Sequence, residues 1–224
     1  MNGATGTAPA FEPDLLEVPT APAAADQRGR ILAATLATVA ERGYGATTVA
    51  QIATEAGVSR AVLGRHFDDK EACYLATYDA LVEWVGEGVR AALSRRGGWP
   101  QAVRTAVEAI LDPIAADPRL ARFCGIEAQR AGAPAFERHR AVVGELARSL
   151  RVGREHCAWG DELPDQLEET LVSGAIWSIA RVAKSGGAES LRGLAPELTY
   201  FLLTPYLDVA EARRMAGLEQ VRSR

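Results

Sequence analysis

Cysteine and long apolar runs are both scarce in this chain of 224 residues, and each scarcity excludes a class of protein. Its three cysteines, Cys73, Cys124 and Cys157, are odd in number and form no CxxC pair. This pattern argues against a disulfide framework or a zinc site and favours a reducing cytoplasm. Charged residues interrupt every long apolar stretch, so no membrane-spanning helix is expected. The chain also does not open on a basic segment followed by an apolar run, which argues against a secretory signal.

The chain has no excess of positive charge either, since its formal net charge is −4. Of its 25 basic residues, only Lys70 and Lys184 are lysines. The first 27 residues hold four acids and no base, and the remainder holds equal numbers of acidic and basic residues. Contact with DNA or phosphate would therefore depend on the local placement of charge and not on a bulk field.

The signatures of common enzymes are absent as well. The sequence contains no nucleophile elbow, P-loop, GxGxxG or HExxH motif. The pair Glu168-Glu169 lies at the start of a solvated predicted helix, and Glu155-His156-Cys157 has no second cluster that could complete a metal site. We therefore expect no catalytic activity, no metal and no cofactor.

What the chain does have is helical periodicity, which predicts an all-α fold. Residues 1–25 are rich in Ala, Pro, Gly and Thr, so they are expected to form a disordered or loosely attached arm. Thr47 is expected to cap the second helix, and Asp68 with Glu71 to form a capping box that opens the fourth. The predicted helices cover 27–42, 47–55, 60–66, 69–93, 100–116, 118–131, 134–157, 163–184, 194–207 and 208–217.

The short predicted helices 47–55 and 60–66 form a helix-turn-helix on physical grounds. Gly57 supplies a positive φ, Val58 fills the angle between the helices, and Ser59 caps the second one. With Leu63 and Phe67 facing inward, the second helix is left with an accessible side that could enter a major groove. Its members are Arg60, Ala61, Val62, Gly64, Arg65 and His66. On geometry alone, the unit could instead be only a packing module.

The run from Arg28 to Leu81 resembles the DNA-binding domain of tetracycline-repressor (TetR) family transcription regulators. The matching pieces are ILAAT (31–35), ERGY (41–44), TTV-x-x-IA-x-x-AGVS (47–59), RHF (65–67) and KE (70–71). The resemblance implies a DNA-binding domain over 26–72, with 60–66 as the recognition helix. It implies phosphate contacts by Thr47 or Thr48 and by Lys70. The DNA-facing surface would add Ser59, Arg60, Ala61, Val62, Arg65 and His66.

Two of these assignments have plain alternatives, and one segment departs from the family pattern. Arg65 could be a solubilising charge, and His66 a partly buried side chain bonded to a carbonyl. The family commonly has Gly-Thr-Leu-Tyr where this chain reads Ala61-Val62-Leu63-Gly64. The hydroxyls that usually bind phosphate are then absent, which predicts fewer phosphate contacts.

The resemblance further implies that 73–224 form a helical domain that binds a small-molecule effector and dimerises. Candidate effector-binding residues are Trp84, Trp99, Phe123, Glu127, Arg130 and Trp177, although an aromatic side chain at helical spacing is more often part of a core than of a pocket. Candidate dimer-interface residues, which could also be the core of a monomer, are Leu167, Leu171, Gly174, Ala175, Ser178, Leu198, Phe201 and Leu202.

These features together predict a cytoplasmic, homodimeric regulator with no membrane partner. It would be a repressor that binds a near-palindromic DNA operator and is released when an effector changes the angle of helix 69–93. The alternative is a TetR-like module that has lost DNA binding and acts in ligand or protein binding.

Overall fold

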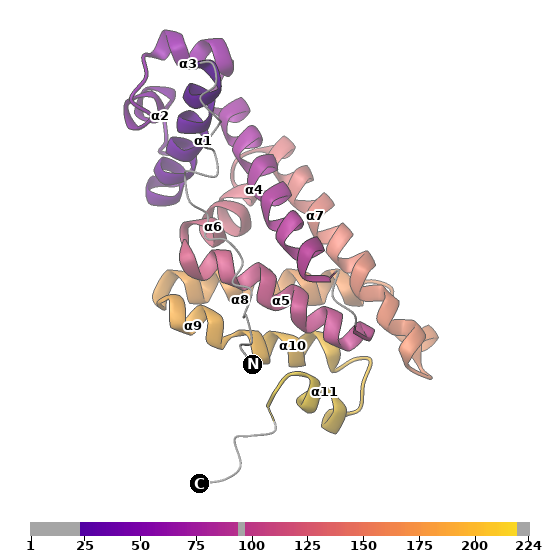
Figure 1. Ribbon diagram of the computed structural model, residues 1–224. Coiled ribbons are helices and arrows are strands. Elements are labelled where there is room, and N and C mark those ends of the chain that lie inside the picture. The colour runs from indigo at the N-terminus through magenta and orange to yellow at the C-terminus, as the bar shows by residue number, and fades with distance from the viewer. Residues whose placement is uncertain (1–22, 94–96, 219–224) are drawn as a thin grey trace.

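The computed structural model describes residues 23–93 and 97–218, which form helices and turns without any strand. The all-α prediction is confirmed. Helices α1 (Ala23–Arg42), α2 (Val49–Glu55) and α3 (Arg60–His66) form a small head at the top of Figure 1. Residues 1–22 of the predicted arm lie outside the described residues. Residues 23–25 are helical, so α1 begins earlier than expected.

The head has an apolar core of its own, to which α4 (Lys70–Leu93) contributes its first turn. The buried members of this core are Ile31, Leu32, Ala34, Ile52, Ala53, Ala56, Leu63, Phe67 and Cys73. Further along the same two helices, Leu36 and Val39 of α1 and Tyr74 and Tyr78 of α4 belong to the larger core below. Helices α1 and α4 therefore belong to both cores and connect the head to the rest of the molecule.

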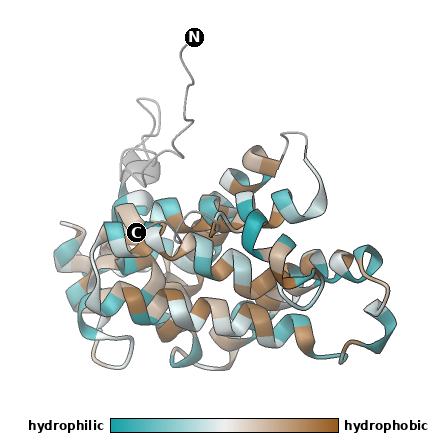
Figure 2. Cartoon of the chain, turned by 90° about the horizontal axis from the view of Figure 1, so that it is seen from below, coloured by the Kyte–Doolittle hydropathy of each residue, from teal (hydrophilic) through white to brown (hydrophobic). Residues whose placement is uncertain are grey.

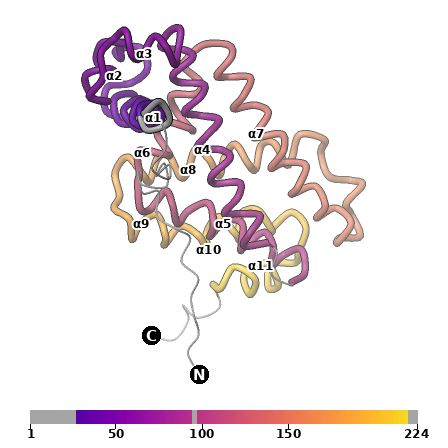
Figure 3. The backbone as a smooth tube through the Cα atoms, turned by 45° about the horizontal axis from the view of Figure 1, so that its top comes forward, coloured from indigo at the N-terminus to yellow at the C-terminus, as the bar shows by residue number. Residues whose placement is uncertain are grey.

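The larger body is built from α5 (Trp99–Ala116), α7 (Ala133–Arg151), α8 (Leu167–Ser185), α9 (Ala188–Gly193) and α10 (Ala195–Leu203). Its core draws residues from all of them, and Figure 2 shows apolar and polar residues on different faces of the helices. Figures 1 and 3 both place the head at one end and α9, α10 and α11 (Val209–Met215) at the other. Helix α4 spans the distance between the two ends, with α7 beside it.

Two predicted helix caps are each wrong by one residue. Thr48, not Thr47, caps α2: its hydroxyl accepts from the Gln51 amide at 3.3 Å, and the Gln51 side chain accepts from the Thr48 amide at 2.8 Å. Asp69, not Asp68, caps α4 by accepting from the Ala72 amide at 2.7 Å. In both places two adjacent residues could cap; at α2 packing decides between them, since Thr47 is buried.

The predicted helix 118–131 is instead three short pieces. They are α6 (Arg119–Ala121), the π-helix η2 (Arg122–Ile126) and the 3₁₀ helix η3 (Glu127–Gln129). The Glu127 amide donates to the Arg122 carbonyl five residues back, which marks the widened turn. A one-residue widening leaves no trace in apolar periodicity, so the sequence could not show it.

The predicted helices 134–157 and 163–184 are both shorter than expected. Helix α7 gives way to a 3₁₀ turn at Val152–His156, and α8 begins only at Leu167. Arg154 explains the late start of α8, because its guanidinium binds the carbonyls of Leu163 and Pro164 at 2.9 and 2.6 Å. The same guanidinium pairs with the buried Glu168 at 2.7 and 3.0 Å, so the connection is fixed to the first turn of α8.

The predicted helix 194–207 is shorter than expected, because α10 ends at Leu203, two residues before Pro205. Helix α9, which was not predicted, directly precedes it. Proline lacks the amide that the next helical bond would need. Asp208 then caps α11, which ends at Met215, close to the predicted bounds of 208–217; Gly217, just beyond it, has a φ of +73°.

The three cysteines are free thiols. Burial raises the pKa of Cys73 to about 11 and that of Cys124 to about 12, so both thiols stay protonated near neutral pH. Of the helices in 23–93 and 97–218, none combines the length and apolar character that a transmembrane span requires.

Candidate DNA-binding and effector sites

The turn between α2 and α3 has the predicted helix-turn-helix geometry. Gly57 has a φ of +63°, and the Val58 amide donates to the Ala53 carbonyl at 3.0 Å. Ser59 caps α3 by accepting from the Val62 amide at 3.1 Å. Leu63 and Phe67 are buried in the head, so α3 is held by one face only.

The opposite face of α3 is open to solvent. Arg60, Ala61 and Arg65 are exposed, whereas Val62 and His66 are half-buried. The His66 ring lies 6.4 Å from the Phe67 ring at a tilt of 43°. Two guanidinium groups on one free side of a seven-residue helix, with no acid in its first turn, suit contact with a polyanion.

Thr47 and Thr48 differ in their exposure to solvent. The Thr47 side chain is 1% exposed and its hydroxyl donates to the Gly43 carbonyl at 2.9 Å, so it is not available for a phosphate. Thr48 is exposed at the start of α2. Of the two alternatives, only Thr48 can reach DNA.

Lys70 is already engaged within the head. Its ammonium donates to the Tyr44 carbonyl at 2.7 Å and lies 4.1 Å from the centre of the Tyr44 ring. Burial, followed by the charges of Glu71 and Asp69, raises the pKa of Tyr44, so its ring stays neutral beneath the cation. A half-exposed ammonium has further donors, but its position depends on the Tyr44 turn.

Gly64 stands in the middle of the exposed face of α3, and a Cβ added there would meet nothing within 4 Å. A larger side chain is therefore accommodated. We expect Gly64→Tyr to tighten DNA binding by about threefold to tenfold, because the hydroxyl can donate to a phosphate and the helix loses a glycine. An anisotropy titration on one DNA fragment measures this, with Gly64→Phe as the control that lacks the hydroxyl. Equal affinities for wild type and Gly64→Tyr would contradict the expectation.

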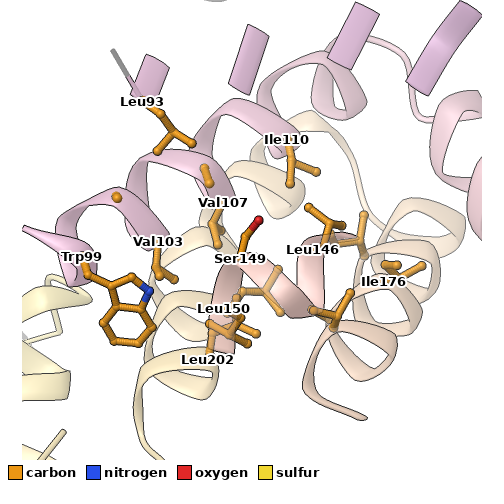
Figure 4. Close-up of a pocket in the computed structure, with 16 residues that line it drawn as sticks. Leu93, Trp99, Val103, Val107, Ile110, Leu146, Ser149, Leu150, Ile176 and Leu202 are labelled. Carbon is orange, nitrogen blue, oxygen red and sulfur yellow. The ribbon is translucent and has the colours of Figure 1, made fainter. Parts of the chain in front are cut away.

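A cavity of about 210 Å³ lies in the body between α5, α7, α8 and α10, beside the last residue of α4. Figure 4 shows aliphatic side chains from these helices pointing into it. The lining residues are Leu93, Trp99, Ala102, Val103, Ala106, Val107, Ile110, Leu146, Ser149, Leu150, Val172, Ala175, Ile176, Ile179, Leu198 and Leu202. All of them except Ser149 and Trp99 are purely hydrocarbon.

The two polar groups of the lining are placed differently. The Ser149 hydroxyl donates to the Glu145 carbonyl of its own helix at 3.1 Å. The Trp99 indole N–H is buried and has no hydrogen-bond partner among the described residues. The Trp99 ring is fixed by stacking on His156 at 5.5 Å and by an edge contact with Tyr206 at 5.1 Å. The indole N–H is therefore enclosed by protein, and the cavity presents an apolar wall to a bound molecule.

Of the six candidate effector-binding residues, only Trp99 lines this cavity. Phe123 is fully buried and stacks on Tyr74 at 4.4 Å, which makes it core. Trp84 packs against the main core, and Arg130 and Trp177 are exposed. Glu127 is buried beside the head. The residues that sequence reasoning missed form aliphatic stripes on α5 and α8, whose spacing is the same as that of core residues.

The candidate dimer residues divide between two faces. Leu171, Ala175, Leu198 and Leu202 are buried within the protomer, and the last three line the cavity. Gly174, Ser178 and Leu167 are partly exposed, and Phe201 is 43% exposed. A Cβ at Gly174 would lie 3.5 Å from the Phe201 ring, so α8 and α10 meet closely at the surface, where Trp177 is also 65% exposed.

Comparison with known proteins supports the interpretation of the head. Residues 31–77 match the family model described as bacterial regulatory proteins, tetR family. The chain is 33% identical over 132 residues to the HTH-type transcriptional activator FasR of Mycolicibacterium smegmatis. That match covers 59% of this chain and 55% of FasR, so it spans about half the length of this curated relative. A shorter match, 36% identical over 72 residues, is to the HTH-type transcriptional regulator CymR of Pseudomonas putida, and covers 32% of this chain and 36% of CymR.

Solved structures share the fold over most of the chain. The fatty acid degradation regulator FadR from Bacillus halodurans superposes with a TM-score of 0.68 at 20% identity, covering 79% of this chain and 94% of FadR. FadR from Bacillus subtilis in complex with stearoyl-CoA gives 0.62 at 15% identity, covering 78% and 97%. AibR in complex with isovaleryl coenzyme A and operator DNA gives 0.62 at 14% identity, covering 77% and 98%. At these identities the likeness shows the fold alone.

Proposed function

Because the chain is a member of the TetR family of bacterial regulatory proteins, we propose that it is a ligand-responsive transcription regulator that binds operator DNA. The observation that carries the proposal is the free face of α3, where Arg60 and Arg65 stand exposed on a capped helix. Such a helix fits the major groove, and arginine pairs bidentately with guanine. We further propose that it acts as a repressor in the cytoplasm and has no catalytic activity.

The DNA-binding unit in this proposal is 26–72, and 73–224 form the effector and dimerisation unit. Arg60 and Arg65 would read base edges or phosphates, and Val62 could meet a thymine methyl. The remaining contacts would come from Thr48, Ser59, Ala61, His66 and Lys70. Thr47 is left out because it is buried.

We propose that two copies associate through the outer faces of α8 and α10. Trp177 and Phe201 are the large apolar side chains exposed there, and Phe201 packs against Gly174 of α8 in the same chain. A dimer would present two heads to half-sites about one helical turn apart.

Trp177→Arg is expected to shift the protein from dimer to monomer at micromolar concentration, because a charge would be buried at the interface. Sedimentation of this variant beside Phe136→Arg, an exposed site on α7, tests the surface. A Trp177→Arg dimer as tight as wild type would reject it.

The cavity suggests the class of effector. Its hydrocarbon lining suits an apolar chain. The structures of FadR from Bacillus subtilis and of AibR, which share this fold, are complexes with stearoyl-CoA and with isovaleryl coenzyme A. We propose an acyl thioester whose chain enters the cavity, with the charged coenzyme outside.

The cavity is also placed to act on α4. Leu93, the last residue of α4, lines it, and the other end of α4 belongs to the core of the head. A ligand that fills the space would displace the lower end of α4 and change the angle of the head. It changes operator affinity only by binding the DNA-incompetent arrangement more tightly, typically by 1–3 kcal/mol.

One titration series tests this function. The probe is a DNA fragment selected from random sequence, and its affinity is measured by fluorescence anisotropy with stearoyl-CoA or with coenzyme A alone. We expect steep loss of affinity with salt, and about 5-fold to 150-fold weaker binding with stearoyl-CoA only. Ala175→Phe, which fills the cavity, is the control: it should bind DNA but not respond. No specific complex, or equal affinity with and without stearoyl-CoA, would refute the proposal.

A further inference from the structure

Glu127 joins the body to the head through one hydrogen bond. It lies at the junction of η2 and η3, and its side chain is buried at 1% exposure. Its Oε2 accepts from the amide of Tyr44 at 2.8 Å, across 83 residues of sequence. Tyr44 stands in the turn between α1 and α2, next to Gly43, whose φ is +84°. A Cβ at Gly43 would lie 3.5 Å from the same oxygen, so the carboxylate is seated directly against this turn.

The charge of Glu127 is only loosely compensated. Arg122 and Arg130 approach Oε1 at 3.7 Å each, and Oε1 has no hydrogen-bond partner among the described residues. The two arginine side chains are 44% and 69% exposed, so solvent weakens both pairs. A buried carboxylate with incomplete bonding is costly to hold, and a small movement of the backbone is enough to expose it.

On the side of the head, the Tyr44 turn positions a proposed DNA contact. The Tyr44 carbonyl holds the Lys70 ammonium at 2.7 Å, and the Tyr44 ring lies under it. The same ring packs edge-on against Tyr74, which stacks on Phe123 of η2 and donates its hydroxyl proton to the Phe123 carbonyl at 2.8 Å. The Tyr44 turn thus contacts η3 through Glu127 and η2 through the Tyr74–Phe123 stack. The position of the Lys70 ammonium depends on this turn.

On the side of the body, η2 touches the wall of the cavity. Gly125 faces α8 so closely that a Cβ there would lie 3.3 Å from Cγ2 of Ile176. Ile176 lines the cavity. A molecule that displaces Ile176 away from the cavity would therefore also displace η2, because closely packed interiors transmit such a shift to the neighbouring element. π-helical turns such as η2 are also frequent at functional sites, where they permit local rearrangement.

From these contacts we infer that Glu127 couples the cavity to the DNA-binding head. With the cavity empty, the bond from the Tyr44 amide to Glu127 holds the turn and Lys70 in the DNA-binding arrangement. Occupation of the cavity moves Ile176 and η2, withdraws Glu127 and releases the turn. The inference rests on the proposed function, because it adds to the displacement of α4 the contact that must break before the head changes its angle. Glu127 is a positioning residue and touches neither ligand nor DNA.

The test compares Glu127→Ala with Glu127→Gln, which keeps an acceptor oxygen for the Tyr44 amide. Glu137→Ala is the matched control, since Glu137 is an exposed glutamate paired with Arg140 on α7. Operator affinity is measured with and without stearoyl-CoA, and stearoyl-CoA affinity is measured separately. We expect Glu127→Ala to bind operator about tenfold more weakly without ligand, to bind stearoyl-CoA within about threefold of wild type, and to show less than about a twofold further response. Glu127→Gln and Glu137→Ala should behave as wild type.

Glu127→Ala with wild-type operator affinity and a wild-type response would overturn the inference. If stearoyl-CoA has no effect even on wild type, the proposed effector fails, whereas the ligand-free comparison still decides the role of Glu127. Hydrogen exchange on the wild-type protein decides it without any variant. Saturating stearoyl-CoA should speed exchange of the Tyr44 amide about tenfold or more and leave the Val58 amide, bonded to Ala53, unchanged. An unchanged Tyr44 amide in protein whose operator affinity has fallen would overturn the inference.

Discussion

Replacing Arg60 and Arg65 together by alanine is expected to weaken operator binding by about a thousandfold or more at physiological salt. A dimer carries both side chains twice, so four guanidinium contacts are lost. At about 1 kcal/mol each, the low end for an arginine contact with a base, the total is about 4 kcal/mol, which is roughly three powers of ten. Both side chains are exposed, and the core of the head does not depend on them, so the fold should be kept.

The double variant Arg213→Ala and Arg214→Ala is the control, because it removes the same charge from exposed positions on α11. It should change operator affinity by no more than about threefold, which reflects long-range charge alone. Titration at several salt concentrations separates phosphate contacts from base contacts, since each lost phosphate contact lowers the salt slope by about 0.9. If the Arg60 and Arg65 variant binds within tenfold of wild type, α3 is not the recognition helix.

Phe123→Ala is expected to lower the free energy of unfolding by about 3–5 kcal/mol, the usual cost of removing a buried aromatic ring. Phe123 is fully buried, and its ring stacks on Tyr74 at 4.4 Å. Removing the ring takes away the η2 end of the stack formed by Tyr44, Tyr74 and Phe123, and leaves a cavity in its place. In a chain of this length, the melting temperature should fall by roughly 10 °C.

Phe136→Ala on α7 is the matched control, because that ring is 45% exposed. It should cost less than about 1 kcal/mol. Thermal unfolding at one protein concentration measures both variants, since dissociation of a dimer would add a concentration dependence. Unchanged stability of Phe123→Ala together with a large loss of stearoyl-CoA affinity would mean that Phe123 belongs to an effector site and not to the core.

The helix-turn-helix could be predicted because its determinants are local. Gly57, Ser59 and the pair Leu63 and Phe67 act within one or two turns of chain, so their spacing specifies both geometry and the exposed side. Even so, Thr48 and not Thr47 caps α2, because Thr47 is buried against α1. That burial depends on how the helices pack and cannot be read from the local sequence.

The cavity could not be predicted, because its determinants are not local. Val103, Val107 and Ile110 follow the same spacing on α5 as residues that fill a core, and only the arrangement of four helices leaves space beside them. On α8, periodicity separates the face of Leu171 and Ala175 from that of Trp177 but does not say which face is buried. The sequence predicts Glu127 as an effector-binding residue, whereas its side chain binds the Tyr44 amide, which lies 83 residues away.

Selection of bound fragments from random double-stranded DNA, followed by sequencing, tests the central claim most directly. The account predicts enrichment of an inverted repeat whose two half-sites are centred about one helical turn, near 10 base pairs, apart, because two heads related by a two-fold axis each place one α3 in the major groove. Enrichment should disappear with the Arg60 and Arg65 double variant. Recovery of no preferred sequence, or of sites without two-fold symmetry, would contradict the account.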